Sequence, residues 1–182
     1  QTAGIVPVNI ERTGIDALAF PGHKALMGPQ GIGGLVLSEA AAEEISPVIA
    51  GGTGSRSDSL QMPDFLPDKL EPGTLNLPGI IGLGAAVDFV RRNFDKIQER
   101  HAQQCRLMWE LLSDIPGTRL AGPRSGEGRV AIFSLVFEGL DNGAAAYILE
   151  KEYEILTRCG LHCAPLAHMA LGTAPMGAVR FS

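Results

Sequence analysis

The chain has 182 residues, of which 45% are hydrophobic and 19% are charged, and its formal net charge is −5. This composition is typical of a globular protein and excludes an intrinsically disordered chain. The acidic balance argues against a nucleic-acid-binding protein, which normally carries a basic surplus or a basic stripe. The length suffices for one domain or for two small lobes with cores of their own.

The chain has three cysteines: Cys105, Cys159 and Cys163. A small, odd number of cysteines suits a reducing compartment better than a disulfide scaffold. No apolar stretch approaches the roughly 18 residues that a membrane helix needs, and no signal peptide or lipidation motif is present. We therefore expect a cytoplasmic protein that does not contact membranes.

The first part of the chain alternates short apolar runs with turn signals. Three of these runs predict buried strands: residues 4 to 8, 17 to 20 and 34 to 37. The long, glycine-studded connection at residues 21 to 33 carries Lys24, and such connections are a common place for function. Ser38 is predicted to cap a short helix that extends through Ile45.

Residues 46 to 78 lack periodicity and are rich in Gly, Pro, Ser and Asp. Two motifs stand out in this segment: Gly-Gly-Thr-Gly at residues 51 to 54, and Glu-Pro-Gly-Thr-Leu-Asn at residues 71 to 76. A loop of this length is uncommon in a compact domain unless it is functional or packs on a partner.

A long helix is predicted from about residue 79 to residue 112, because apolar residues recur there at three- and four-residue steps. Pro78 fits the helix start, and Pro-Gly at residues 116 and 117 fits its end. A helix of this length spans roughly 50 Å and often joins two lobes. On its apolar face we expect Cys105 to be a core thiol and His101 to be a packed or interfacial histidine and not a ligand.

The remainder predicts a second, smaller α/β lobe. Its expected elements are a strand at residues 130 to 137, a helix at 143 to 153, a short strand at 155 to 157, a turn-rich segment at 158 to 165 and a last strand at 178 to 181. The chain opens on Gln1 without a methionine and closes inside an apolar, strand-like run. We therefore expect it to be a piece of a longer protein.

Taken alone, Lys24 has two interpretations. A lysine that directly follows a buried strand and precedes a glycine turn is held close to the backbone and partly desolvated. Burial lowers the pKa of a lysine and frees its amine to attack a carbonyl. The alternative is a solvated loop lysine, which the local pattern by itself favours.

The surrounding sequence resembles a known family. The run Phe-Pro-Gly-His-Lys at residues 20 to 24, with the glycines that follow it, is similar to the cofactor-lysine segment of class V aminotransferases and cysteine desulfurases, which are pyridoxal-phosphate enzymes of fold type I. The resemblance implies that Lys24 bears the cofactor and that Gln1 is the Gln of the family's Asp-x-x-Gln segment, whose Asp is absent here. Pro21 stands where the family often has a Ser or Thr that contacts phosphate. Phosphate binding is therefore expected to rely on His23, backbone amides and Thr74.

The resemblance continues through the loop at residues 71 to 76. In the family, a Glu-x-Gly-Thr-x-Asn loop places its Thr, here Thr74, on the cofactor phosphate of the neighbouring subunit. The glycines at residues 51 to 54 occupy another loop near that interface. These matches imply a homodimer, and backbone amides with a hydroxyl are suitable anion ligands in their own right. Without the resemblance, Thr74 is an ordinary loop threonine.

The final motif carries the implied sulfur chemistry. The segment from Arg158 to residue 164 resembles the Arg-x-Gly-x-His-Cys-Ala segment of short-loop cysteine desulfurases. In those enzymes the Cys of this segment, which corresponds to Cys163 here, receives sulfur as a persulfide. The resemblance assigns Arg180 to the substrate carboxylate, and Arg158 adds positive potential. Cys159 is an extra thiol that resolves a persulfide, forms a disulfide or packs. A zinc site formed by Cys159, Cys163 and the two nearby histidines is disfavoured because the spacing matches no standard pattern.

The prediction is an α/β protein: residues 1 to 78 belong to the C-terminal part of a large pyridoxal-phosphate-binding domain, residues 79 to 115 form a connecting helix, and residues 116 to 182 form a small, truncated C-terminal α/β domain. The expected activity removes sulfur from L-cysteine to give alanine and a persulfide, with a sulfur-acceptor protein as a further partner and no metal. The fragment alone is expected to be inactive. The alternatives are a class V aminotransferase, a selenocysteine lyase, or a non-catalytic interaction lobe without cofactor.

Overall fold

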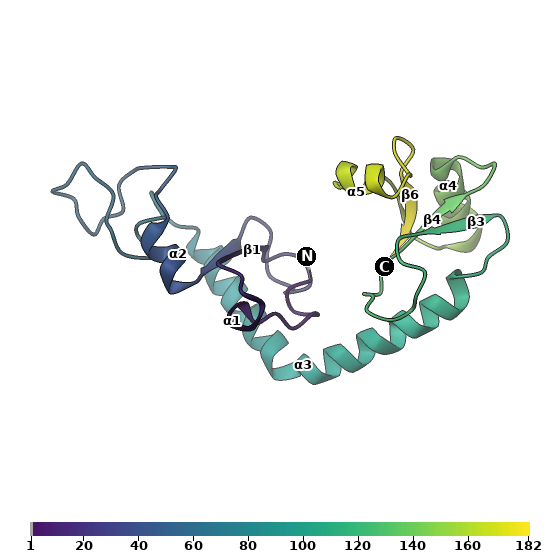
Figure 1. Ribbon diagram of the computed structural model, residues 1–182, viewed down its shortest axis with the longest axis horizontal. Helices are drawn as coiled ribbons and strands as arrows, with labels where there is room; N and C mark the ends of the chain where they lie inside the picture. Colours follow the sequence, from purple (N-terminus) through teal and green to yellow (C-terminus); the bar gives the residue numbers. More distant parts are fainter. Residues whose placement is uncertain (1) are drawn as a thin grey trace. The chain divides into compact units, whose positions relative to one another are not determined.

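The computed structural model describes residues 2 to 182, so the predicted role of Gln1 lies outside the described residues. The chain divides into two compact units, Gln1–Gln98 and Glu99–Ser182. Figure 1 shows the elements of each unit, with the long helix α3 running from one unit into the other. No helix among residues 2 to 182 has the length and apolar character needed to cross a membrane.

The first unit is built on a two-stranded antiparallel sheet. Strand β1 (Ala17–Pro21) pairs with β2 (Gly33–Leu37), in a register that places Phe20 opposite Gly34. Gly34 is needed there because a Cβ atom would overlap the Phe20 ring. The prediction of these two strands is confirmed, but both are exposed or half-buried along their length, so the predicted burial is wrong. Among the described residues of this unit, no third strand covers the sheet edges.

Two short helices flank the sheet. Helix α1 (Ile10–Thr13) begins where the Asn9 side chain accepts the Arg12 N–H, and α2 (Glu39–Glu44) begins where Ser38 Oγ accepts the Ala41 N–H. The predicted cap at Ser38 is therefore confirmed, and α2 ends one residue before its predicted limit. The strand predicted at residues 4 to 8 is wrong: the carbonyl of Thr2 accepts two backbone N–H groups in a turn, and Pro7 lacks the donor that a strand would need.

The segment between α2 and α3 has no regular structure over residues 46 to 76, as its composition predicts. Lys69 fixes this loop to the helix before it. Its ammonium group donates hydrogen bonds to the carbonyls of Ala42 at 2.8 Å and Glu43 at 3.1 Å, and the residue is only 9% exposed. The two carbonyls belong to the last turn of α2, where no helical donor remains for them.

Helix α3 (Leu77–Leu112) begins two residues before its predicted start. Asn76 caps it, because the Asn76 Oδ1 accepts the Gly79 N–H at 3.1 Å. The predicted apolar face is confirmed at its two buried positions, Val90 in the first unit and Cys105 in the second. Pro78 lies in the first turn of the helix, where the sequence analysis expects it, directly after the Asn76 cap.

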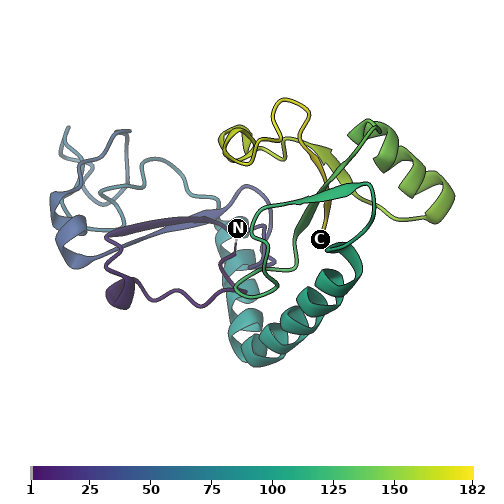
Figure 2. The ribbon, with the colours of Figure 1, turned by 45° about the vertical axis from the view of Figure 1, so that its right-hand side comes forward.

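The second unit contains a four-stranded antiparallel sheet in the order β3-β4-β6-β5. The bounds of its strands are Thr118–Ala121, Phe133–Phe137, Ala178–Phe181 and Arg158–Gly160 in that order. Helix α4 (Asn142–Tyr153) packs against β5 and β6, and α5 (Pro165–Ala170) follows β5 (Figure 2). Both β3 and α5 were missed by the sequence prediction, and the short strand lies at Arg158–Gly160 rather than at residues 155 to 157.

The core of the second unit lies at the centre of its sheet. Phe133, Leu135 and Val179 are fully buried there, on the neighbouring strands β4 and β6. Asp141 caps α4, since its Oδ1 accepts the N–H groups of residues 143 and 144. Asn142 ties α4 to the turn before β6, donating from Nδ2 to the Gly177 carbonyl at 3.1 Å. These contacts fix the start of α4 and the turn that precedes β6.

Candidate active site

The predicted cofactor lysine lies in a tight turn that follows β1. The Gly28 N–H donates to the Gly22 carbonyl at 2.8 Å, and the Gly22 N–H donates to the Ile32 carbonyl at 2.9 Å. A Cβ atom on Gly22 would approach a Leu83 methyl group at 2.9 Å, and one on Gly28 would approach the Gly22 carbonyl at 2.9 Å. Glycine is required at both positions because the backbone closes on itself around Lys24.

Lys24 and His23 are exposed on this turn. Among the described residues, Lys24 Nζ takes part in no hydrogen bond and no ion pair. The predicted partial desolvation of Lys24 is therefore wrong for this chain, because no described element of the first unit covers the turn. The amine is nevertheless free to condense with an aldehyde, and so the residue fits the chemistry of a pyridoxal cofactor.

The two glycine-rich motifs of the loop between α2 and α3 are held together. The Gly73 N–H donates to the Gly52 carbonyl at 2.7 Å, and a Cβ atom on Gly51 would lie 3.2 Å from Pro72. Gly73 has a φ of 87°, which only glycine adopts readily. The Thr74 hydroxyl is exposed beside this junction and has no hydrogen-bond partner among residues 2 to 182. The arrangement offers backbone amides and a free hydroxyl, the donors that suit a phosphate.

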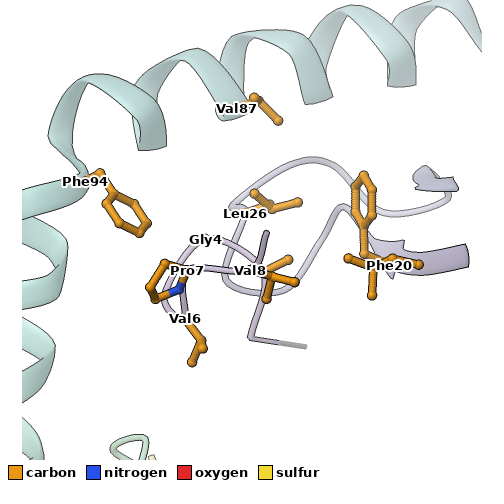
Figure 3. Close-up of a pocket in the computed structure, with 10 residues that line it drawn as sticks. Gly4, Val6, Pro7, Val8, Phe20, Leu26, Val87 and Phe94 are labelled. Carbon is orange, nitrogen blue, oxygen red and sulfur yellow. The ribbon is translucent and has the colours of Figure 1, made fainter. Parts of the chain in front are cut away.

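A separate hollow of about 460 Å³ lies in the first unit between the segment that follows residue 2, β1 and α3 (Figure 3). Its side chains are apolar, among them Val8, Phe20, Leu26, Val87 and Phe94. Lys24 does not line it, and no titratable side chain does. The hollow can receive apolar surface but cannot perform acid–base chemistry.

In the second unit, β5 and the turn after it place a cysteine beside an arginine. Arg158 Nη2 donates to Cys163 Sγ at 3.8 Å, and both side chains are exposed. His162 Nε2 lies 2.7 Å from the Arg158 carbonyl oxygen. A carbonyl only accepts, so Nε2 carries the hydrogen of the neutral imidazole and Nδ1 carries the lone pair. The guanidinium thus offers a hydrogen-bond donor to the sulfur, the atom through which a cysteine acts as a nucleophile.

Arg180 lies on β6 directly opposite Arg158 on β5 and directly opposite Ser134 on β4. Cross-strand partners project from the same face of a sheet, so the two guanidinium groups share one face. Neither has a carboxylate partner among the described residues, and Arg180 Nε is buried without a hydrogen-bond partner there. Two like charges on one face, unneutralised within the chain, make a site that favours an anion.

Two histidines lie behind this turn. Burial lowers the pKa of His162, and the nearby positive charge of Arg180 lowers it further, while the bond to the Arg158 carbonyl opposes the shift. His168, in the last turn of α5, is 5% exposed, and its Nδ1 lies 2.7 Å from Thr173 Oγ1. The ring centroids of His162 and His168 are 5.4 Å apart. His168 entered the sequence analysis only as part of the disfavoured zinc site, and Thr173 was missed.

The remaining cysteine and histidine predictions can be compared with the structure directly. Cys105 is buried and donates from Sγ to the Arg129 carbonyl, which confirms a core thiol. His101 Nε2 accepts the Ala131 N–H at 3.1 Å, which confirms a packed histidine. Cys159 is a free, exposed thiol on β5. Among residues 2 to 182, no three side chains of the His, Cys, Asp and Glu types gather in a way that could hold a metal ion.

The α/β fold is similar to that of cysteine desulfurases. The apo structure of the cysteine desulfurase from Thermococcus onnurineus matches with a TM-score of 0.86 at 32% identity, over 100% of this chain and 45% of that one. A cystine C-S lyase in complex with cysteine persulfide matches with a TM-score of 0.75 at 24% identity, over 99% of this chain and 45% of that one, and shows the fold alone.

The family follows from the sequence match. The model of the aminotransferase class-V family covers residues 1–182, so the chain belongs to that family. The probable cysteine desulfurase of Methanothermobacter thermautotrophicus is 35% identical over 178 residues, which are 94% of this chain and 44% of that protein. The chain thus spans less than half the length of this relative. The position of the matched stretch within these longer proteins stays a prediction. The domain limits within this chain also stay predictions.

Proposed function

We propose that this chain is part of a pyridoxal-phosphate-dependent cysteine desulfurase, and that Cys163 receives the sulfur of L-cysteine. The observation that carries the proposal is the contact between Arg158 and an exposed Cys163, on a sheet face that also bears Arg180. Membership of the class-V family and 35% identity to a probable cysteine desulfurase support it.

The proposed reaction balances without an external oxidant. The carbon–sulfur bond of L-cysteine breaks, a sulfur–sulfur bond forms on Cys163, and the products are alanine and a Cys163 persulfide. Cys163 attacks through its sulfur, to which Arg158 Nη2 donates at 3.8 Å. Arg180 grips the substrate carboxylate through its guanidinium, which has no carboxylate partner among the described residues. When bound, pyridoxal phosphate would supply the electron sink for negative charge at the substrate Cα while the bond between Cβ and sulfur breaks.

Lys24, His23 and Thr74 are the residues that we assign to the cofactor. The free amine of Lys24 holds it and then moves protons at the substrate Cα. The Thr74 hydroxyl and the neighbouring backbone amides bind its phosphate, with His23 beside Lys24. No hydrogen bond joins Thr74 to the Lys24 turn among the described residues, which agrees with a Thr74 that serves the neighbouring subunit of a homodimer. We assign Gln1 to cofactor binding as well, on the basis of the sequence motif.

The exposure of Cys163 suits the next step as well. A persulfide at an exposed position can be reached by a sulfur-acceptor protein, which we propose as the partner. A reducing compartment such as the cytoplasm would keep Cys163 as a thiol, as the reaction requires. In domain terms, we propose that residues 1 to 78 belong to the large cofactor-binding domain and residues 116 to 182 to the small domain, joined by the α3 segment.

A pair of matched serine variants tests the proposal. In the full-length, cofactor-loaded protein, Cys163→Ser should abolish sulfide release from L-cysteine while cofactor binding, followed by visible absorbance, is retained. Cys159→Ser is the control, since Cys159 is an equally exposed thiol on β5, and it should retain turnover. Undiminished sulfide release by Cys163→Ser would instead support the lyase alternatives, in which this cysteine is incidental. A colourless protein that binds no cofactor would support the interaction lobe.

A further inference from the structure

The turn from Arg158 to Cys163 is closed by two opposed contacts. The His162 side chain reaches back to the Arg158 backbone, donating from Nε2 to its carbonyl at 2.7 Å. The Arg158 side chain reaches forward past it to Cys163 Sγ at 3.8 Å. The guanidinium can meet the thiol only while the turn keeps residues 158 and 163 close together.

The backbone of this turn is strained. His162 has a φ of 53° and Cys163 a φ of 61°, so two consecutive residues with side chains adopt the left-handed conformation. Residues with a Cβ atom adopt this conformation at a cost in free energy and persist in it only where neighbouring contacts hold them. The Ala164 N–H donates to the Leu161 carbonyl at 2.8 Å and closes the turn at its base. The His162–Arg158 hydrogen bond is the side-chain contact that ties this turn back to β5.

The rest of the environment fixes the His162 ring. His168 packs beside it with a ring-centroid distance of 5.4 Å and an interplanar angle of 57°. The His168 ring is fixed in turn by the Thr173 hydroxyl at 2.7 Å. The charged and titratable groups that face His162 are Arg158, Arg180, His168 and the adjacent Cys163. The Nε2–H donor is present in both the neutral and the protonated imidazole, so the bond to the carbonyl does not depend on the charge of His162.

We propose that His162 is a positioning residue for Cys163: its hydrogen bond to the Arg158 carbonyl holds the strained turn that keeps the Cys163 thiol against the Arg158 guanidinium. The proposal deepens the proposed function, since it assumes that Cys163 is the sulfur-accepting thiol. Loss of the bond lets the turn relax toward ordinary backbone angles. Cys163 then leaves the guanidinium, and its sulfur loses the Arg158 hydrogen-bond donor.

Alkylation of the native full-length protein by iodoacetamide tests this, with each cysteine quantified by peptide mass. The rate at Cys163 reports the reactivity of its sulfur within the native turn and needs neither cofactor nor turnover, so this test stands apart from the Cys163→Ser experiment. In His162→Ala the rate at Cys163 near neutral pH should fall about two- to fivefold, the factor that an exposed charge contact is worth.

Two further variants separate the hydrogen bond from the backbone strain. A Gln side chain can place its amide N–H where the His162 Nε2 lies, so His162→Gln should restore most of the rate. Gly relieves the strain but has no donor, so His162→Gly should stay slow. The Cys159 rate should be the same in all variants, and the buried Cys105 should stay unreactive in a folded protein.

Three results would overturn the proposal. The first is a His162→Ala protein whose Cys163 rate matches the parent. The second is a His162→Gly protein that recovers as fully as His162→Gln, because backbone freedom alone would then explain the effect. The third is an equal loss of rate at Cys159, which would show a general loosening of the lobe. If His162→Ala does not fold, the comparison of the Gln and Gly variants decides.

Discussion

Lys69 offers a sharp test of how the loop between α2 and α3 is held. Its ammonium donates to the Ala42 and Glu43 carbonyls at 2.8 and 3.1 Å from a position that is 9% exposed. Lys69→Met keeps the length and apolar contacts of the side chain and removes the donors. Both carbonyls then lose their partner at the end of a six-residue helix.

The expected magnitude follows from these contacts. A hydrogen bond from a charged donor contributes roughly 1.5 to 3 kcal/mol, and a buried acceptor left unpaired costs about 1 to 3 kcal/mol. The charge also complements the helix dipole, by about 0.5 kcal/mol. Removing a buried charge recovers part of this through relief of desolvation. We therefore expect Lys69→Met to lower the free energy of unfolding by about 2 to 3 kcal/mol.

Urea denaturation measures the change, and limited proteolysis of residues 46 to 68 reports whether this loop is released. Lys96→Met is the matched control, because Lys96 is exposed on α3 in the same unit and should change stability by less than about 0.5 kcal/mol. A Lys69→Met protein as stable and as protease-resistant as this control would refute the reasoning that Lys69 holds the loop.

Three further predictions concern the second unit. Gly177→Ala should destabilise by about 3 kcal/mol or more, measured by urea denaturation, because its Cβ would overlap the Gly160 backbone. Gly172→Ala, at a φ of 65° but in open space, should cost only about 1 kcal/mol, and equal losses would contradict this account. Asn142→Asp replaces the amide donor by a carboxylate that points at the Gly177 carbonyl, so it should lower the melting temperature of the lobe. An unchanged melting temperature would show that the 3.1 Å hydrogen bond does not stabilise the protein. Burial lowers the pKa of His162 in the folded protein below its ordinary 6.5, so as the pH falls the unfolded chain binds a proton at His162 before the folded chain does. The contribution of neutral His162 to the free energy of unfolding is therefore complete above pH 6.5 and is lost as the pH falls through the folded-state pKa. In His162→Gln the free energy of unfolding should accordingly vary less with pH in that window.

Periodicity and local chemistry were sufficient for several elements. Helix α3 follows from its repeating apolar face, and the caps at Ser38 and Asp141 follow from residues that bond the next backbone N–H groups. The resemblance also placed Arg158 near Cys163, and the contact between them joins residues only five positions apart in the chain. Each of these features depends on interactions between near neighbours in the chain.

The elements that the sequence prediction missed depend on distant partners. Strand β5 begins at Arg158 because it pairs with Arg180 on β6, and no local pattern at residues 155 to 157 shows that pairing. Lys69 reads as a surface lysine until the fold brings the end of α2 over it. The exposure of Lys24 reflects the absence, among the described residues, of any element over its turn.

The most direct test of the central claim is the mass of the Cys163 peptide after reaction. The full-length, cofactor-loaded protein is incubated with L-cysteine, digested without reductant and analysed by mass spectrometry, while alanine is measured in the supernatant. The account predicts one added sulfur atom on the Cys163 peptide, formed together with alanine, and none on Cys105. Alanine formation with no added sulfur on Cys163, or with the sulfur on Cys159 alone, would contradict it.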